Sequence, residues 1–267
     1  MMREDKPKSF DEHRQYLHKI VRLKLWFVWY WQQKHKEESF SSILRNRVDI
    51  YRKTDINQGA MNPPQVYFDD PQWLDLEHKL LDLYRKHSSD DDAFQFEHNA
   101  FHILKPIIDK RAFRDYLEPP YVLDFQCGSL KYDRPEKNNP TCVSFHIANA
   151  LAPGSIFDDK NYLPDCLISL MDKSSAEYGA DSLYTSSWLN SHPLWQKLFP
   201  EEWEKNMESE NHDIQWHFGF WGQFITARGI FNDRLGRQLR ETGRFPFLPR
   251  YSWCSFESLR NHLSEFL

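Results

Sequence analysis

The stretch Thr-Cys-Val-Ser-Phe-His-Ile, residues 141–147, decides the fold class. Its side chains alternate between two sets, Cys142, Ser144 and His146 on one face and Val143, Phe145 and Ile147 on the other. Such alternation predicts a β-strand. Residues 121–126 and 129–133 also predict strands, so we expect a three-stranded antiparallel meander that begins after Pro119-Pro120.

Upstream of this sheet the sequence predicts only helices, over residues 10–36, from Asp70-Pro71 onward, and over 93–117. In the first of them, apolar residues recur at three- and four-residue steps. Aromatic residues then make its C-terminal half apolar nearly all round, namely Trp26, Phe27, Tyr30 and Trp31. Such a helix is buried in a core, or it docks on a partner such as a second copy of the chain.

Downstream, the sequence predicts a helix over 159–178 ended by Gly179, a strand over 182–187, and helices over 193–206, 222–242 and 255–266. A short strand is expected over 214–218. The fold class is therefore α+β. We expect a helical domain over residues 1–118 and a second domain over 119–267 with a mixed or antiparallel sheet and flanking helices.

Composition narrows the functional classes. The 267 residues are 40% hydrophobic and 27% charged, which is typical of a folded chain large enough for its own core. A net charge of −5 gives no electrostatic reason to expect nucleic acid as a partner. The four cysteines form no C-x-x-C pair, and no apolar run approaches membrane length, so we expect a cytoplasmic protein with reduced thiols.

Three polar segments of the second domain are the candidate site. His146 ends a strand just before Asn149, which is a candidate substrate-binding residue. A histidine there suits a general base because its ordinary pKa is near neutrality. Ser187 and His192 lie at a strand-to-helix crossing, where either suits the acid, with Trp188 and Asn190 as binding residues. The third segment supplies further candidate binding residues among aromatics and glycines, namely His217, Trp221 and Gln223.

A metal site is the alternative use of the same histidines. His146, His192 and His217 could meet as three ligands for hydrolysis or oxygenation. His98 and His102 have helical i, i+4 spacing, although Glu97 precedes them and the H-E-x-x-H order is missing. Phosphate-binding P-loops, G-x-S-x-G elbows and G-x-G-x-x-G turns do not occur.

Residues 125–206 resemble a bacterial family of two-domain acyltransferase-domain proteins, which pair a helical N-terminal domain with a GNAT-like C-terminal domain. The resemblance rests on Gly128-Ser-Leu-Lys-Tyr132, Phe145-His-Ile147 with Pro153 beyond it, Cys166-Leu-Ile-Ser-Leu170, and Ser187-Trp-Leu189. Ala148-Asn149 stands where the family has Pro, and Asn190-Ser-His192 where it has Leu-Asp. The glycine-containing pyrophosphate loop of ordinary acetyltransferases is missing.

The resemblance implies transfer of an acyl group from an acyl-thioester, acyl-coenzyme A, to a small amine or hydroxyl. His146 would then be the base and Ser187 the acid, with Gly154 and Ser155 at the cofactor. We expect a small-molecule substrate and no membrane span. The alternatives are a histidine-ligated metal enzyme and a non-catalytic protein that binds a small ligand or a partner.

Overall fold

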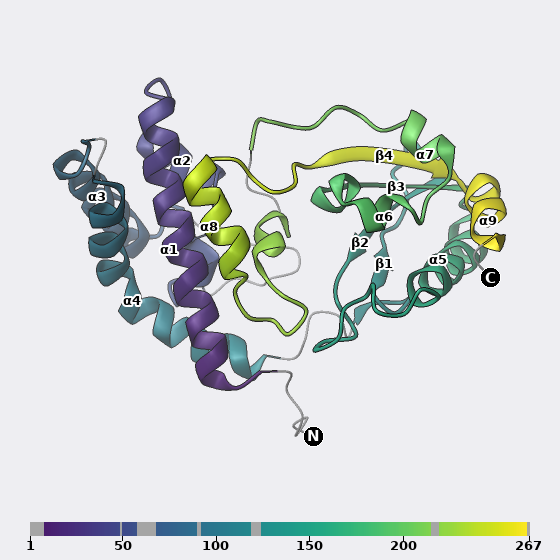
Figure 1. Cartoon of the computed structure of the whole chain (residues 1–267), viewed down its shortest axis with the longest axis horizontal. Coiled ribbons are helices and arrows are strands. Elements are labelled where there is room, and N and C mark those ends of the chain that lie inside the picture. The colour runs from purple at the N-terminus through teal and green to yellow at the C-terminus, as the bar shows by residue number, and fades with distance from the viewer. Residues whose placement is uncertain are drawn as a thin grey trace. The chain divides into compact units, whose positions relative to one another are not determined.

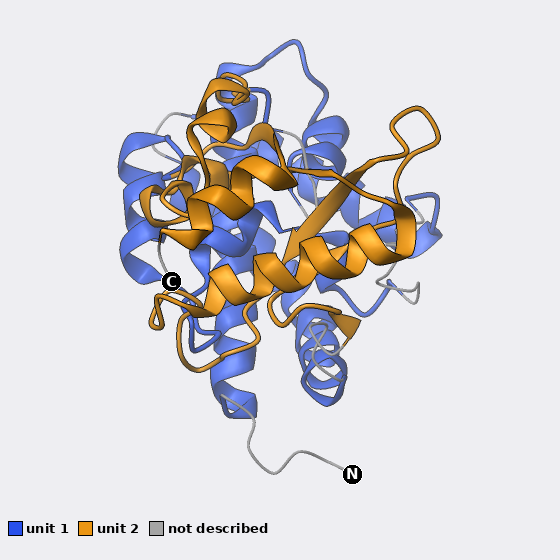
Figure 2. Ribbon diagram, turned by 90° about the vertical axis from the view of Figure 1, so that its right-hand side faces the viewer, with its two compact units in different colours: residues 1–118, 213–246 blue, residues 119–212, 247–267 orange. Residues whose placement is uncertain are grey.

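The computed structural model describes residues 8–48, 50–57, 68–89, 92–118, 124–214 and 219–265. These divide into two compact units, which Figure 2 colours blue and orange. The helical unit comprises residues 1–118 and 213–246, and the sheet unit comprises 119–212 and 247–267. Among the described residues, no helix has the length and apolar character that crossing a bilayer requires.

The helical unit is built around two long helices, α1 (Phe10–Lys34) and α4 (Ala93–Leu117), which pack on each other (Figure 1). Its other elements are α2 (Phe40–Asn46), η1 (Tyr51–Lys53), α3 (Pro71–Lys86), η4 (Phe220–Phe224) and α8 (Asp233–Thr242). Helix α1 starts with a capping box, in which Ser9 and Glu12 bond each other's backbone amides. Helix α3 starts with the Asp70 cap and Pro71 that the sequence predicts.

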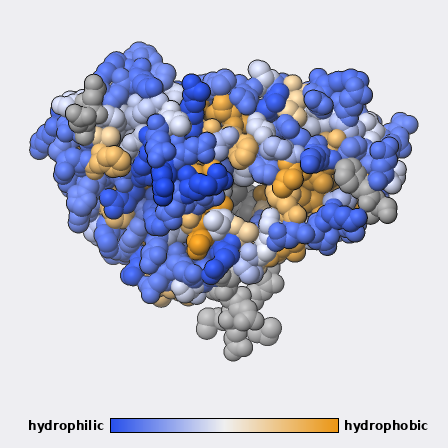
Figure 3. All heavy atoms as spheres, in the orientation of Figure 1, coloured by the Kyte–Doolittle hydropathy of each residue, from blue (hydrophilic) through white to orange (hydrophobic). Residues whose placement is uncertain are grey.

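The aromatic residues of α1 lie in the core of this unit. Trp26, Phe27 and Trp29 are buried, and Phe27 contacts Trp221 and Phe245 edge to face. In Figure 3 hydrophilic side chains cover most of the visible surface over the helical unit. These aromatic residues of α1 therefore pack in the core, where Phe245 covers Phe27, and a homodimer through this helix stays a prediction.

The sheet unit contains β1 (Leu130–Tyr132), β2 (Cys142–Ile147), β3 (Ser182–Ser187) and β4 (Arg250–Ser255), in the order β1-β2-β3-β4. Its helices are α5 (Tyr162–Tyr178), η3 (Trp188–Ser191), α6 (Pro193–Gln196), α7 (Glu201–Lys205) and α9 (Phe256–Ser264). Strand β2 pairs with β1 antiparallel and with β3 parallel, and β3 pairs with β4 antiparallel. The protein is thus α+β with a mixed sheet, as the sequence predicts.

Several local predictions differ from the structure. Residues 121–123 of the expected first strand lie outside the described residues, and 124–126 form no strand. Of the expected meander, the antiparallel pair of 129–133 with 141–147 is confirmed as β1 and β2, and residues 124–126 add no strand to it. The next strand of the sheet, β3, is reached by a crossover through α5 and runs parallel to β2. Strand β4 was not predicted. The expected domain 119–267 also differs, since residues 213–246 belong to the helical unit.

Candidate functional site

The two faces of the sheet have different environments. One face carries buried residues that pack under α5, α6 and α9, among them Leu130, Val143, Phe145, Leu183 and Cys254. On the other face the register aligns Ser144, Tyr184 and Trp253 in one row, and pairs Lys131 with His146 and Ser186 with Tyr251 in the next. His146 and Trp253 are exposed. This second face, which we call the open face, can therefore meet a ligand.

His146 on the open face is held by a carboxylate. Its Nε2 lies 2.6 Å from Oδ2 of Asp133, and Ser144 Oγ donates to the same oxygen at 3.1 Å. Asp133 directly follows β1, and its backbone N–H donates to Ser144 O. The hydrogen bond with His146 is the main cause that lowers the pKa of Asp133, although burial opposes it. The aspartate thus stays ionised and orients the imidazole.

The orientation decides which ring nitrogen can act. When Nε2 carries the hydrogen that Asp133 accepts, the neutral ring keeps its lone pair on Nδ1. The His146 side chain is 48% exposed, so a ligand can approach it. A carboxylate-oriented imidazole with a free lone pair is the arrangement that general-base catalysis requires.

His146 also lies where two parallel strands stop pairing with each other. The β2–β3 ladder joins Cys142–Ser144 to Ser182–Tyr184, only the first half of each strand. Beyond it, the carbonyl of Phe145 accepts from Thr185 Oγ1 at 3.0 Å. The second half of β2, with His146 on it, therefore continues without ladder pairs to β3 among the described residues.

Two of the three predicted catalytic residues, His146 and Ser187, do not come together. Strand alternation places His146 and Ser187 on opposite faces, because Ser186 is the residue of β3 on the His146 face. The Ser187 side chain instead accepts from Leu189 N and caps η3.

His192 is packed among aromatic rings. It stacks on Phe157 with ring centroids 5.3 Å apart, and its centroid lies 5.0 Å from that of Phe247. Burial lowers its pKa, and its buried Nδ1 has no hydrogen-bond partner among the described residues. The His192 imidazole is therefore neutral, and it forms part of an aromatic wall near the ends of β2 and β3. Trp188 extends this wall, with its ring stacked 5.9 Å from Phe247.

The two predicted asparagines hold the backbone. Asn190 is fully buried, donates to the carbonyls of Thr185 and Arg250, and accepts from the indole of Trp195. Asn149 donates to Gly154 O and accepts from Leu151 N. We therefore reassign both from binding a substrate to shaping the loops that follow β2 and β3.

The third segment belongs to the helical unit. Trp221 and Gln223 are buried there, and Gln223 donates to Phe220 O. Both side chains lie in the core of the helical unit, so their expected role as substrate-binding residues is not supported. His217 lies outside the described residues.

A metal site is not formed by the part of the chain that the structure describes, where no group of three or more His, Cys, Asp or Glu side chains could hold an ion. The rings of His98 and His102 do lie close together, with centroids 4.8 Å apart. The three-histidine hypothesis includes His217, so it stays a prediction.

The expected cofactor residues do not fit the diphosphate of coenzyme A. Ser155 N donates to the carboxylate of Asp158 at 2.7 Å, and Gly154 N donates to Leu151 O. The amides of Gly154 and Ser155 are thus already engaged, the second by a negative charge of the protein itself.

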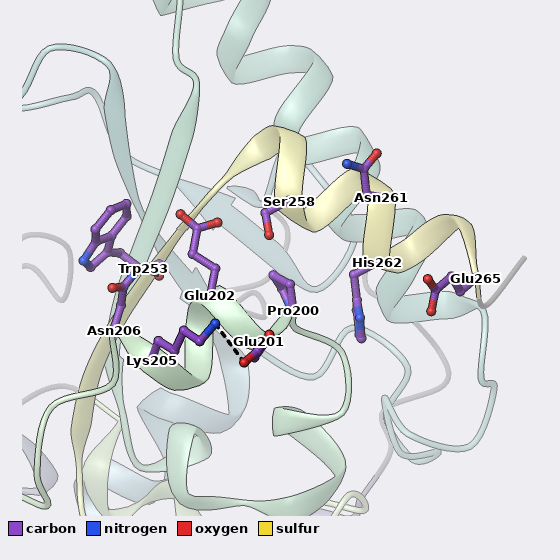
Figure 4. A pocket seen from close by; sticks show the side chains of 10 residues that line it. All are labelled: Pro200, Glu201, Glu202, Lys205, Asn206, Trp253, Ser258, Asn261, His262 and Glu265. Atoms are coloured by element: carbon purple, nitrogen blue, oxygen red, sulfur yellow. Dashed lines mark hydrogen bonds and ion pairs between the residues drawn. The ribbon is translucent and has the colours of Figure 1, made fainter.

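A groove of about 560 Å³ lies between α7, α9 and β4 (Figure 4). Trp253 and Asn206 stand at one end of it and Glu265 at the other. Its polar groups fasten α7 to β4, since Glu202 accepts from Ser255 N and Oγ and Asn206 donates to Trp253 O, while Lys205 pairs with Glu201 within α7. We assign it to the packing of this edge.

Sequence reasoning missed Asp133, although its signal was present. An antiparallel pairing of 129–133 with 141–147 already brings Asp133 toward Ser144 and His146. Comparisons of the chain with protein-family models, with curated proteins and with solved structures found no match. The function is therefore argued from the site alone.

Proposed function

We propose that the protein transfers an acyl group from a thioester to an amine or hydroxyl of a small acceptor. The observation that carries this proposal is the Asp133–His146 pair on the half of β2 that no longer pairs with β3. In this proposal the thioester lies along β2 beyond Ser144, where ladder pairing with β3 has ended, and the acceptor reaches His146 from the open face.

The step needs one base. The acceptor's nitrogen or oxygen attacks the thioester carbonyl carbon, and a new C–N or C–O bond forms. His146 Nδ1 takes the proton of the acceptor, and Asp133 stabilises the imidazolium that results. The C–S bond then breaks, and the thiolate leaves and collects the proton. Base catalysis of this kind contributes about 10²–10⁴-fold to a rate.

The open face also supplies groups that fit an acceptor. The rings of Tyr184 and Tyr251 lie 5.4 Å apart, and burial raises the pKa of both phenols. They are therefore neutral at pH 7 and can donate a hydrogen bond or pack against a ring. Trp253 extends this surface along the Tyr184 row.

The sheet unit as a GNAT-like domain is part of the same proposal. A parallel pair joined through a helix, with an antiparallel strand on each side, supports it. A reducing, cytoplasmic setting also belongs to the proposal, because all four cysteines are buried free thiols.

The test is thiol release from acetyl and hexanoyl thioesters of N-acetylcysteamine, with a panel of small amines and amino alcohols as acceptors. His146→Gln is expected to lose on the order of 100-fold in turnover, and Asp133→Asn a smaller part of it. His35→Gln is the matched control, since His35 is a partly exposed histidine of the helical unit that bonds Glu37 at 3.1 Å. Equal turnover in His146→Gln and in the wild type would refute the assignment of the base.

A further inference from the structure

The loop from β2 to α5, residues 148–161, has already used most of its backbone donors. Hydrogen bonds run from the amides of Ala148 and Ala150 to Ser129, from Leu151 to Asn149, from Gly154 to Leu151, and from Phe157 and Asp158 to Ser155. Pro153 has no N–H to give. A phosphate-binding loop directs several adjacent backbone N–H groups at one point. In this loop most N–H groups instead donate to acceptors of the loop itself or of Ser129.

Two further amides bind carboxylates of the same loop. Ser155 N donates to Asp158 Oδ2 at 2.7 Å, and Asn161 N donates to Asp159 Oδ1 at 2.9 Å. Asp165 adds a third carboxylate in the first turn of α5. Lys160 is the single basic side chain of the described loop. The start of α5 is therefore occupied by negative charge, and a diphosphate there would be repelled.

The loop is closely packed at Gly154. A Cβ added at Gly154 would lie 3.3 Å from Leu151 O and 3.5 Å from Asp158 Oδ2. Pro164, in the first turn of α5, removes another N–H from the helix start. Moving Asp158 aside would leave the Ser155 amide without its acceptor.

Uncharged aromatic rings contact this loop, whereas a phosphate site would need cationic side chains. Phe157, from this loop, stacks on His192, which follows β3, and Phe247 contacts His192 from another segment of the sheet unit. Rings from the loops after both β2 and β3 thus meet in contact. They suit the uncharged amide and thioether groups of a pantetheine-like arm.

We infer that the acyl donor of this protein is a thioester of an uncharged pantetheine-type arm and that the nucleotide diphosphate of coenzyme A contributes nothing to its binding. This inference rests on the proposed acyl transfer. In an enzyme that binds coenzyme A through its diphosphate, the nucleotide contributes binding energy that raises kcat/KM. Here the two donors are expected to react with similar kcat/KM.

The experiment compares kcat/KM for S-acetyl-pantetheine and acetyl-coenzyme A on the full chain, by thiol release. We expect a ratio within about tenfold of one. Asp158→Asn and Asp165→Asn are expected to raise kcat/KM for acetyl-coenzyme A by about threefold, through removal of like charge, and to leave S-acetyl-pantetheine unchanged. Asp172→Asn, farther along α5, is the matched control and is expected to change neither donor.

The outcomes separate the two claims. A preference for acetyl-coenzyme A of more than tenfold overturns this inference and leaves the proposed acyl transfer standing. The same holds if Asp158→Asn and Asp165→Asn affect both donors alike. No thiol release from either donor overturns the proposed function and the inference with it.

Discussion

In the helical unit the carboxylate of Glu97 is 5% exposed and lies between Arg22 and Arg240, whereas in the sheet unit the carboxylate of Asp133 is 45% exposed and lies beside His146. Glu97 joins α4 to α1 and to α8, so its ion pairs hold three helices together. Asp133 joins two neighbouring strands that the ladder already holds. The comparison indicates that buried ion pairs hold the fold together, whereas exposed ion pairs remain accessible to a ligand.

Glu97→Ala removes the buried ion pairs of the comparison and has the largest expected effect on stability. It leaves two partly buried guanidinium groups without their shared carboxylate, which costs about 3–5 kcal/mol of unfolding free energy. Urea denaturation followed by far-UV circular dichroism measures the loss. A loss below about 1 kcal/mol, the range of surface pairs, would show that burial does not make this pair structural.

Two helix-terminating glycines sharpen the comparison between the units. Gly243 ends α8 with φ +65° and Gly179 ends α5 with φ +68°. A Cβ at Gly179 would meet nothing within 4 Å, whereas one at Gly243 would collide with the ring of Tyr30. Tyr30 has little room to yield, because it stacks on Trp26 at 5.0 Å and carries Lys34 over its ring.

Gly179→Ala is therefore expected to cost about 1–2 kcal/mol for the left-handed backbone alone. Gly243→Ala adds overpacking and is expected to cost about 2–4 kcal/mol. Thermal unfolding of both variants measures the order. Equal losses would mean that Tyr30 moves aside freely and that the helical core is looser than its contacts indicate.

Local signals predicted several helix ends, but neither every helix nor the connections between distant segments. The single helix expected over 222–242 is divided into η4 and α8, the one expected over 193–206 is divided into α6 and α7, and α2 was not predicted. The cap at Ser9, the Asp70-Pro71 start and Gly179 each fix a helix end through a few adjacent residues. Strand β4 was missed although its residues alternate in burial from Tyr251 to Cys254, because an edge strand far from its partner gives a short pattern. The return of 213–246 to the helical unit depends on contacts such as Trp221 with Phe27, which no local pattern reveals.

The residues of the candidate site divide in the same way, into those that the local sequence identifies and those that depend on distant contacts. His146 was found because a strand-end histidine is recognisable in one sequence, and Asp133 was within reach of the predicted antiparallel pairing. The opposite orientation of Ser187 follows only from the register of β2 on β3, which a single sequence does not give. From the sequence alone, a buried asparagine such as Asn190 cannot be distinguished from one that binds a substrate. Its polarity does not show whether its side chain bonds backbone carbonyls or a ligand.

Asp133→Asn tests the accessible side of the comparison and has the smallest expected effect on stability. Because the pair is about half exposed, the loss at pH 6 is expected to stay below about 1 kcal/mol. His146 lowers the pKa of Asp133 in the folded state. The pair therefore contributes stability above the ordinary aspartate range, near pH 4, and this contribution disappears as the pH falls through the depressed pKa. The difference between wild type and Asp133→Asn should accordingly shrink from pH 5 to pH 2 in urea titrations. A difference that stays constant, or that exceeds the loss in Glu97→Ala, would make Asp133 a structural residue and remove the reason for assigning chemistry to His146.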